Sequence, residues 1–227
     1  MDFARLPMRH EAPDLIRQVD RFLERGFSVE EVFVDLLAPA ARHLGDLWSR
    51  DECDFIDVTM GLWRLQEVLR EISLRVPSGP SSIGRPIGHP IGQARSAVFC
   101  PVPGDVHTFG AQMIEEVFAR AGWQSEALLR PHRRELLDYM ASRPVDAIGL
   151  TVSHNHSVSV LARLIKAIRS VAVKPNLVVL VGGHMINCNP ALVAEIGADG
   201  TGEDAKAALA IAARLVDAAQ TRARAIA

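Results

Sequence analysis

Half of the eight histidines in this sequence lie in three short segments, each of which follows an apolar run. They are His107 in residues 101–110 (PVPGDVHTFG), His154 and His156 in 152–157 (VSHNHS), and His184 in 182–187 (GGHMIN). Imidazole can ligate a metal or transfer a proton near neutral pH. These three segments are therefore where the sequence first predicts a functional site.

Asp105 and His107 are two residues apart, and Gly110 follows three residues later. At this spacing the carboxylate can hold one ring nitrogen of the imidazole, which fixes the tautomer and makes the other nitrogen a better metal ligand. Gly110 would let a bulky group approach the backbone. The same residues also fit a plainer structure, in which Asp105 caps a helix and His107 is merely exposed. The spacing alone leaves both interpretations open.

Residues 96–227 alternate short apolar runs with amphipathic helical patterns. The predicted strands cover residues 96–101, 123–129, 146–152, 177–181 and 198–201. The predicted helices cover 106–121, 135–142, 158–171, 190–196 and a last segment from Glu203 almost to the end. This repeat favours an α/β fold with a flavodoxin-like, doubly wound, five-stranded parallel sheet. Ligands bind at the carboxyl ends of the strands in such sheets, which is where the histidine segments would meet.

Residues 1–76 show only helical periodicity and predict a small bundle of three helices, or four if the N-terminal arm adds one. Residues 77–95, rich in Pro and Gly, predict a linker to the second domain, 96–227. Ser28 and Glu31 have the spacing of a capping box, which predicts the start of the second helix, and a third helix is expected to start near Asp54. The second helix carries an apolar stripe, formed by Val32, Leu36, Ala40, His43, Leu44 and Leu47. Trp48 and Trp63 are predicted to be core residues, and His10 lies on the arm, which we expect to be flexible.

Composition excludes several classes of protein. The net charge is −2, from 25 basic and 27 acidic residues, which argues against a protein that binds nucleic acid or anionic membranes through bulk charge. We find neither a run of about 18 apolar residues nor a secretory signal. The three cysteines form no CxxC pair, so neither a disulfide framework nor a zinc knuckle is expected. A cytoplasmic protein is the simplest expectation.

The pattern Asp105-x-His107-x-x-Gly110 directly after the first predicted strand resembles the cobalamin-binding domain of methionine synthase, methylmalonyl-type mutases and cobalamin light sensors. Thr151 and Ser153 after the third strand, and Gly182-Gly183 after the fourth, continue the resemblance. It implies that His107 ligates cobalt from the lower face, in place of the vitamin's own base, and that the displaced nucleotide tail fills a slot beside the sheet. The implied cofactor-binding residues are Asp105, Val106, His107, Thr108, Gly110, Thr151, Ser153, Gly182, Gly183 and Trp48.

Residues 47–66 (LWSRDECDFIDVTMGLWRLQ) resemble the AerR/PpaA group of cobalamin-binding antirepressors, whose helical bundle caps the corrin. The Glu-His pair that follows the corresponding Trp in other relatives is absent after Trp48, which argues against an upper cobalt ligand from this helix. His10 is the candidate upper ligand, with His43 as its competitor and water as a third possibility.

The resemblance to this group implies a light-responsive transcriptional regulator and not an enzyme. Its partner would be a photosystem repressor of the CrtJ/PpsR type, with no membrane contact and only indirect or weak DNA contact. The expected cofactor is hydroxocobalamin, with adenosyl- or methylcobalamin as the precursor.

Three other functions stay open at this point. A corrinoid carrier protein of a methyltransferase system would share the layout of bundle and sheet. A haem-binding redox sensor of the same fold is a further alternative. A hydrolase with two metal ions would use the DVH and HNH segments as ligand pairs.

Overall fold

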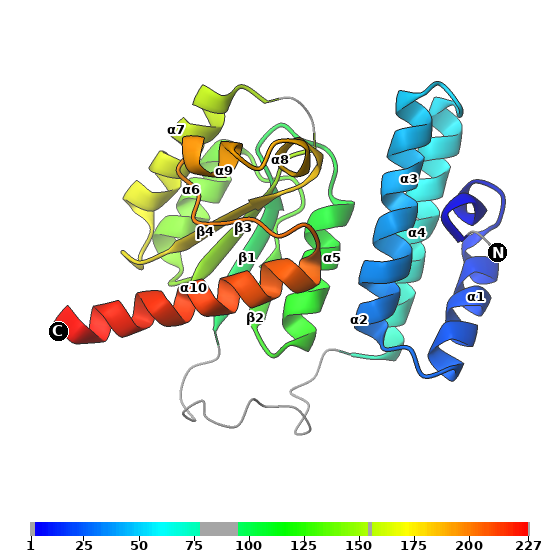
Figure 1. Ribbon diagram of the computed structural model, residues 1–227, viewed down its shortest axis with the longest axis horizontal. Coiled ribbons are helices and arrows are strands. Elements are labelled where there is room, and N and C mark those ends of the chain that lie inside the picture. The colour runs from blue at the N-terminus through cyan, green and yellow to red at the C-terminus, as the bar shows by residue number, and fades with distance from the viewer. Residues whose placement is uncertain (1–2, 78–94, 154–155, 227) are drawn as a thin grey trace. The chain divides into compact units, whose positions relative to one another are not determined.

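The computed structural model describes residues 3–77, 95–153 and 156–226, which divide into two compact units, Met1–Ser78 and Gly79–Ala227 (Figure 1). Almost all of the predicted linker, 77–95, lies outside the described residues, as does His154. Among the described helices, none has the length and apolar character needed to cross a membrane. We call the two parts the helical unit and the sheet unit.

The sheet unit contains a parallel sheet in the order β2-β1-β3-β4, which confirms the doubly wound α/β class. Its strands are β1 (Ser96–Pro101), β2 (Gln124–Ala127), β3 (Ala147–Thr151) and β4 (Val178–Gly182). β2 lies at one edge and alternates exposed Gln124 and Glu126 with half-buried neighbours. Glu126 accepts hydrogen bonds there from Tyr139 (2.9 Å) and Arg143 (2.8 Å).

The predicted fifth strand, residues 198–201, is wrong as an element of the sheet. Only one bridge forms there, between Leu180 and Gly200. The carboxylate of Asp199 accepts a hydrogen bond from the Val179 N–H at 2.6 Å. Because a side chain takes this donor, no backbone carbonyl of the segment pairs with it, and the ladder does not extend.

Helices cover both faces of the sheet (Figure 1). One face packs against α6 (Arg133–Ser142), α7 (Val158–Val171), α8 (His184–Cys188) and α9 (Leu192–Glu195). The other packs against α5 (Phe109–Arg120) and α10 (Ala205–Ile226). Two elements differ from the prediction at the carboxyl edge of the sheet. The helix α5 begins three residues later than expected, so Asp105–Thr108 form a loop, and α8 replaces part of the predicted loop 182–187.

The helical unit contains a 3₁₀ helix and three long helical segments. They are η1 (Phe3–Met8), α1 (Ala12–Glu24), the continuous run of α2 (Val29–Glu31), η2 (Val32–Leu37) and α3 (Ala38–Ser49), and α4 (Phe55–Arg75). Two of them start at capping boxes, Ser28 with Glu31 and Asp54 with Asp57, in which each side chain accepts the other residue's backbone N–H. The capping box at Ser28 and the helix start near Asp54 were predicted and are confirmed.

A π-helical segment, η2, changes which residues of the second helix are buried. Pro39 lies just after it and has no N–H to donate to the carbonyl four residues earlier, which favours a widened turn. Phe33 and Leu37 are consequently fully buried, whereas Leu36 of the predicted stripe is only half-buried. The 3.6-residue period used for the prediction does not hold across a π turn.

The segment before His10 is not the flexible arm that we expected. It forms η1, with Phe3 and Pro7 buried. Arg64 of α4 donates to the carbonyl of Pro7, which precedes His10 in the sequence, at 2.9 Å. It also forms an ion pair with Glu11, which follows His10. His10 itself is exposed in the turn between η1 and α1.

The prediction that Trp48 and Trp63 are core residues is also wrong. They are 47% and 49% exposed, and Phe55 beside Trp48 is 69% exposed. The Trp48 and Phe55 rings meet edge to face with centroids 6.3 Å apart. The helical unit therefore presents aromatic side chains at its surface, where the apolar pattern alone predicts burial.

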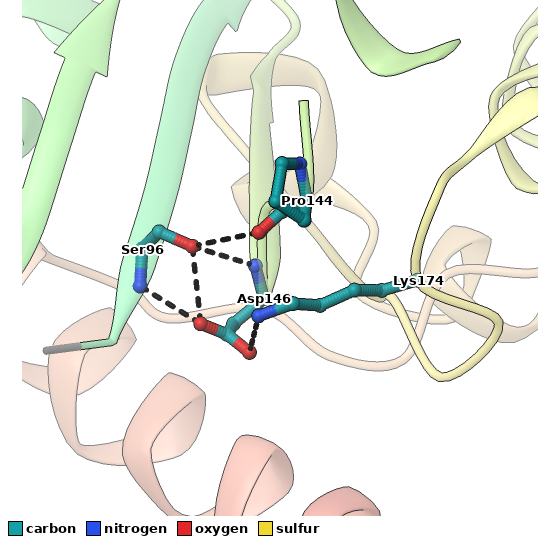
Figure 2. Close-up of polar contacts among 4 residues, drawn as sticks. All are labelled: Ser96, Pro144, Asp146 and Lys174. Carbon is teal, nitrogen blue, oxygen red and sulfur yellow. Dashed lines mark hydrogen bonds and ion pairs between the residues drawn. The ribbon is translucent and has the colours of Figure 1, made fainter. Parts of the chain in front are cut away.

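At the amino ends of the strands, the carboxylate of Asp146 joins β1, β3 and the loop before β4 (Figure 2). It accepts hydrogen bonds from the Ser96 N–H (2.9 Å) and hydroxyl (3.0 Å) and contacts the Lys174 ammonium at 2.6 Å. Burial opposes ionisation of this nearly buried carboxyl, but Lys174 and the Ser96 donors outweigh it and lower the pKa of Asp146. The cluster fixes the amino edge of the sheet.

The stability of the sheet unit should depend on the charge of Asp146. Its folded-state pKa lies below its ordinary value of 3.8, so its contribution is complete above that pH and is lost as the pH falls through the folded-state pKa. We expect Asp146→Asn to lower the unfolding free energy near neutral pH by about 1–3 kcal/mol and to flatten this acid dependence. Hydrogen exchange of the β1 and β3 amides measures both effects.

Asp138→Asn, at an exposed position on α6, is the control and should leave these amides unchanged. If the β1 and β3 amides were equally protected in Asp146→Asn and the parent protein, near neutral pH and in acid alike, this role of the cluster would be contradicted.

Candidate functional site

A tight turn places Asp105 and His107 directly beyond β1. The Asp105 N–H donates to the Val102 carbonyl at 2.9 Å, and Gly104 within the turn has a φ of +96°, which favours glycine. Since α5 begins only at Phe109, His107 lies in the loop at the carboxyl edge of the sheet.

The Asp105 side chain is fully buried and has three donors around it. Its Oδ1 accepts the His107 backbone N–H at 3.0 Å and lies 2.7 Å from His107 Nδ1, while Oδ2 accepts the Ser153 N–H at 2.9 Å. Burial opposes the charge, but the two backbone donors and the His107 ring prevail and hold the pKa of Asp105 below its usual value. A charged Asp105 therefore ties the loop after β1 to the loop after β3.

The contact between Asp105 and His107 is the pairing that their spacing predicts for a metal-ligating imidazole. The alternative, in which Asp105 caps α5, is wrong, because Thr108 is the N-cap residue and Asp105 bonds to His107 and Ser153 instead. The His107 side chain is 42% exposed. With Nδ1 against the carboxylate, Nε2 is the nitrogen that would ligate a metal.

The residues around this pair differ sharply in exposure. Val106 is 63% exposed and Thr108 is 9% exposed. Val106 is thus an exposed apolar side chain next to His107 in the sequence, and it could contact a flat, largely apolar group bound by the imidazole.

The ends of β3 and β4 are fastened by backbone hydrogen bonds. The Val152 N–H donates to the Gly182 carbonyl (2.8 Å), and the Met185 N–H donates to the Val152 carbonyl (3.2 Å). Gly183 has a φ of +97°, and a Cβ there would lie 2.6 Å from the Val152 oxygen. At Gly182, by contrast, a Cβ would meet no described atom within 4 Å. The two adjacent glycines thus serve different purposes: Gly183 allows close packing, and Gly182 leaves room.

Buried polar atoms without a partner among the described residues lie close to the same edge. Thr151 Oγ1, at the end of β3, is one of them, and a Cβ at Gly110 would meet only the Thr151 methyl group, at 3.9 Å. A buried polar atom without a hydrogen bond costs about 1–3 kcal/mol, so a bound ligand group that supplies the bond would be favoured. The residues present therefore fit a polar group inserted beside Thr151 and Gly110.

Gln112 Oε1 on α5 and Thr201 Oγ1 after the Gly200 bridge are also buried and without a partner among the described residues, and the sequence patterns predicted neither. Gln112 lies two residues beyond Gly110, so the helical pattern could have placed it near the site. No comparable signal marks Thr201.

The remaining predicted site residues belong to the helical unit or to other segments of the sheet unit. His10 and Trp48 belong to the helical unit, as does His43, whose Nε2 is buried and lacks a partner among the described residues. His156 donates its backbone N–H to Met185 Sδ at 3.4 Å, and His184 is exposed on α8. In residues 3–77, 95–153 and 156–226, no three His, Cys, Asp or Glu side chains are grouped to hold a metal.

Comparisons with known proteins give matches to a family, to a relative and to a solved structure. A family model described as the B12 binding domain matches residues 95–210, and a second model with the same description matches residues 2–72. The sequence is 30% identical over 180 residues to an uncharacterized 20.5 kDa protein in the bchF-crtJ intergenic region of Rhodobacter capsulatus, covering 79% of this chain and 89% of that one. The structure is similar to the Methanosarcina barkeri monomethylamine corrinoid protein, with a TM-score of 0.67, 18% identity and 88% of each chain covered.

The neighbouring glycines 182 and 183 provide a test of the site's geometry. We expect Gly183→Ala to lower the unfolding free energy by about 1–3 kcal/mol, because the new methyl group meets the Val152 backbone and the backbone conformation is strained. Gly182→Ala should stay within about 0.5 kcal/mol of the parent protein. Urea unfolding followed by circular dichroism measures both values, and equal effects of the two substitutions would contradict this geometry.

Proposed function

Since this chain belongs to the B12 binding domain family, we propose that its sheet unit binds cobalamin and that His107 ligates the cobalt from the lower face of the corrin ring. The observation that carries the assignment is the 2.7 Å contact between Asp105 Oδ1 and His107 Nδ1. It orients the ring so that Nε2 is the nitrogen that would ligate the cobalt. A charged Asp105 favours the His107 tautomer with the proton on Nδ1. The Asp105 charge is itself stabilised by the backbone N–H groups of His107 and Ser153.

The displaced nucleotide tail of the cofactor needs a slot beside the sheet. Support for its place comes from the open space at Gly182, the lack of close neighbours at Gly110, and the Thr151 hydroxyl, which has no partner among the described residues. The Thr151 hydroxyl can donate to or accept from a polar group of the tail, and Gly110 and Gly182 leave the volume that side chains would otherwise fill.

We further propose that the protein is a light-responsive regulator and not an enzyme, acting on a photosystem repressor of the CrtJ/PpsR type. When bound, an alkylcobalamin such as adenosyl- or methylcobalamin would supply a light-sensitive cobalt–carbon bond. The relative from the bchF-crtJ intergenic region supports this proposal, since its name places it beside a crtJ gene. The resemblance of residues 47–66 to the antirepressor group supports it independently.

Binding of hydroxocobalamin tests the assignment of His107. We expect His107→Ala to lose the colour that the parent protein keeps after desalting. Asp105→Asn should weaken binding by about 10–100-fold, because a partner that orients the ligand is removed. Gly182→Ala should fold normally and yet bind more weakly. Absorbance titration measures all three.

His132→Asn is the matched control, because this exposed histidine caps α6, where Asn also caps well. Undiminished binding by His107→Ala would rule out this lower ligand. The roles of His10 as upper cobalt ligand and Trp48 as corrin contact stay predictions, and a changed visible spectrum of the loaded His10→Ala variant would support the former.

The regulatory role is tested with a purified CrtJ/PpsR-type repressor and its operator DNA. We expect the chain loaded with an alkylcobalamin to weaken operator binding at least about tenfold after illumination, equivalent to 1.4 kcal/mol, and not in the dark. Fluorescence anisotropy of labelled operator measures this change, with His107→Ala as the inactive control. Transfer of a methyl group from a donor through the bound corrinoid would instead favour a carrier protein, and a haem spectrum without corrinoid binding would favour the redox sensor.

A further inference from the structure

The short helix α8 brings a thiol and an imidazole together at the carboxyl edge of the sheet. His184 and Cys188 are its first and last residues, four positions apart and hence on the same helix face. Cys188 Sγ lies 3.6 Å from His184 Nε2 and 4.0 Å from Nδ1. Both residues are exposed.

The other two cysteines have quite different surroundings. Cys100 is completely buried in β1, and this burial raises the pKa of its thiol to about 12. Cys53 is partly buried, and its burial together with the carboxylates of Asp57, Asp54 and Glu52 raises the pKa of its thiol. Both effects keep a thiol protonated, and only the thiolate is a good nucleophile. Cys188 is therefore the one thiol of the three that is both exposed and beside a base.

We propose that Cys188, with His184 as its proton acceptor, is a site of thiol–disulfide exchange with small disulfides such as oxidised glutathione. The proposal rests on the distance between the two side chains and on their exposure, and it does not depend on cobalamin binding. The product is a mixed disulfide on α8, which directly follows Gly183.

The exchange is balanced with the small disulfide as the oxidant. His184 Nε2 takes the proton of the Cys188 thiol, and the thiolate attacks one sulfur of the disulfide. The bond between the two sulfurs of the small molecule breaks as the Cys188 mixed disulfide forms. The leaving thiolate takes the proton back from the imidazolium, so one thiol is consumed and one is released.

Rates of reaction with dithiobis(nitrobenzoate) and oxidised glutathione test the proposal on the full chain. The parent protein should show one fast-reacting thiol by release of the coloured thiolate, and one glutathione adduct, located by peptide mass spectrometry at Cys188. Cys188→Ser should abolish both, whereas Cys53→Ser should keep both. His184→Asn should slow the reaction by at least about threefold, since the proton acceptor is lost.

His132→Asn, the exposed histidine of α6, is the control and should react at the parent rate. Circular dichroism of each variant confirms that it is folded. A fast phase that disappears in Cys53→Ser, or a His184→Asn variant that reacts as fast as the parent protein, would overturn the proposal.

Discussion

A charge buried inside a protein must find donors, and the carboxyl edge of this sheet is arranged around that requirement. The carboxylate of Asp105 has lost its water and keeps its charge because two backbone N–H groups and the His107 ring replace the solvent. Two loops that follow different strands are held together in consequence, and one imidazole is held in a fixed orientation. Asp146 meets the same requirement at the amino edge with Ser96 and Lys174. Each end of the sheet is thus fastened by one buried acid.

The surroundings of the His107 imidazole distinguish it from a structural histidine. Gly183 allows the loop after β4 to pack on the Val152 backbone, while Gly182 and Gly110 leave volume close to Thr151, whose buried hydroxyl has no partner among the described residues. A structural histidine would need neither the space nor an unsatisfied hydroxyl. Together with membership of the B12 binding domain family, this combination of an oriented imidazole and a buried hydroxyl without a partner among the described residues accounts for the proposed cofactor better than the imidazole alone.

Local patterns predicted the parts of this protein that local interactions determine. The spacing of Ser28 and Glu31 predicted a helix start, and that of Asp105 and His107 predicted their contact, because each involves neighbours in the chain. The predictions were wrong where an interaction between distant residues, or an unusual helical turn, determines the structure. The Asp199 side chain takes the donor that a fifth strand needed, and a π turn before Pro39 shifts the buried face from Leu36 to Leu37. Local sequence patterns predict neither the exposure of Trp48 nor the unsatisfied Thr201 hydroxyl, because both depend on which other elements pack nearby.

The two margins of the sheet also affect how the protein meets other copies of itself. Edge strands with free backbone groups are templates for edge-to-edge aggregation. Here β2 is only four residues long, and Tyr139 and Arg143 hold the Glu126 carboxylate at its margin, where a negative charge discourages an incoming strand. On the opposite margin, the Val181 N–H is already bonded to the Gly200 carbonyl and the Val179 N–H to Asp199. In the part of the chain that the structure describes, the sheet therefore offers little template for fibre-like growth.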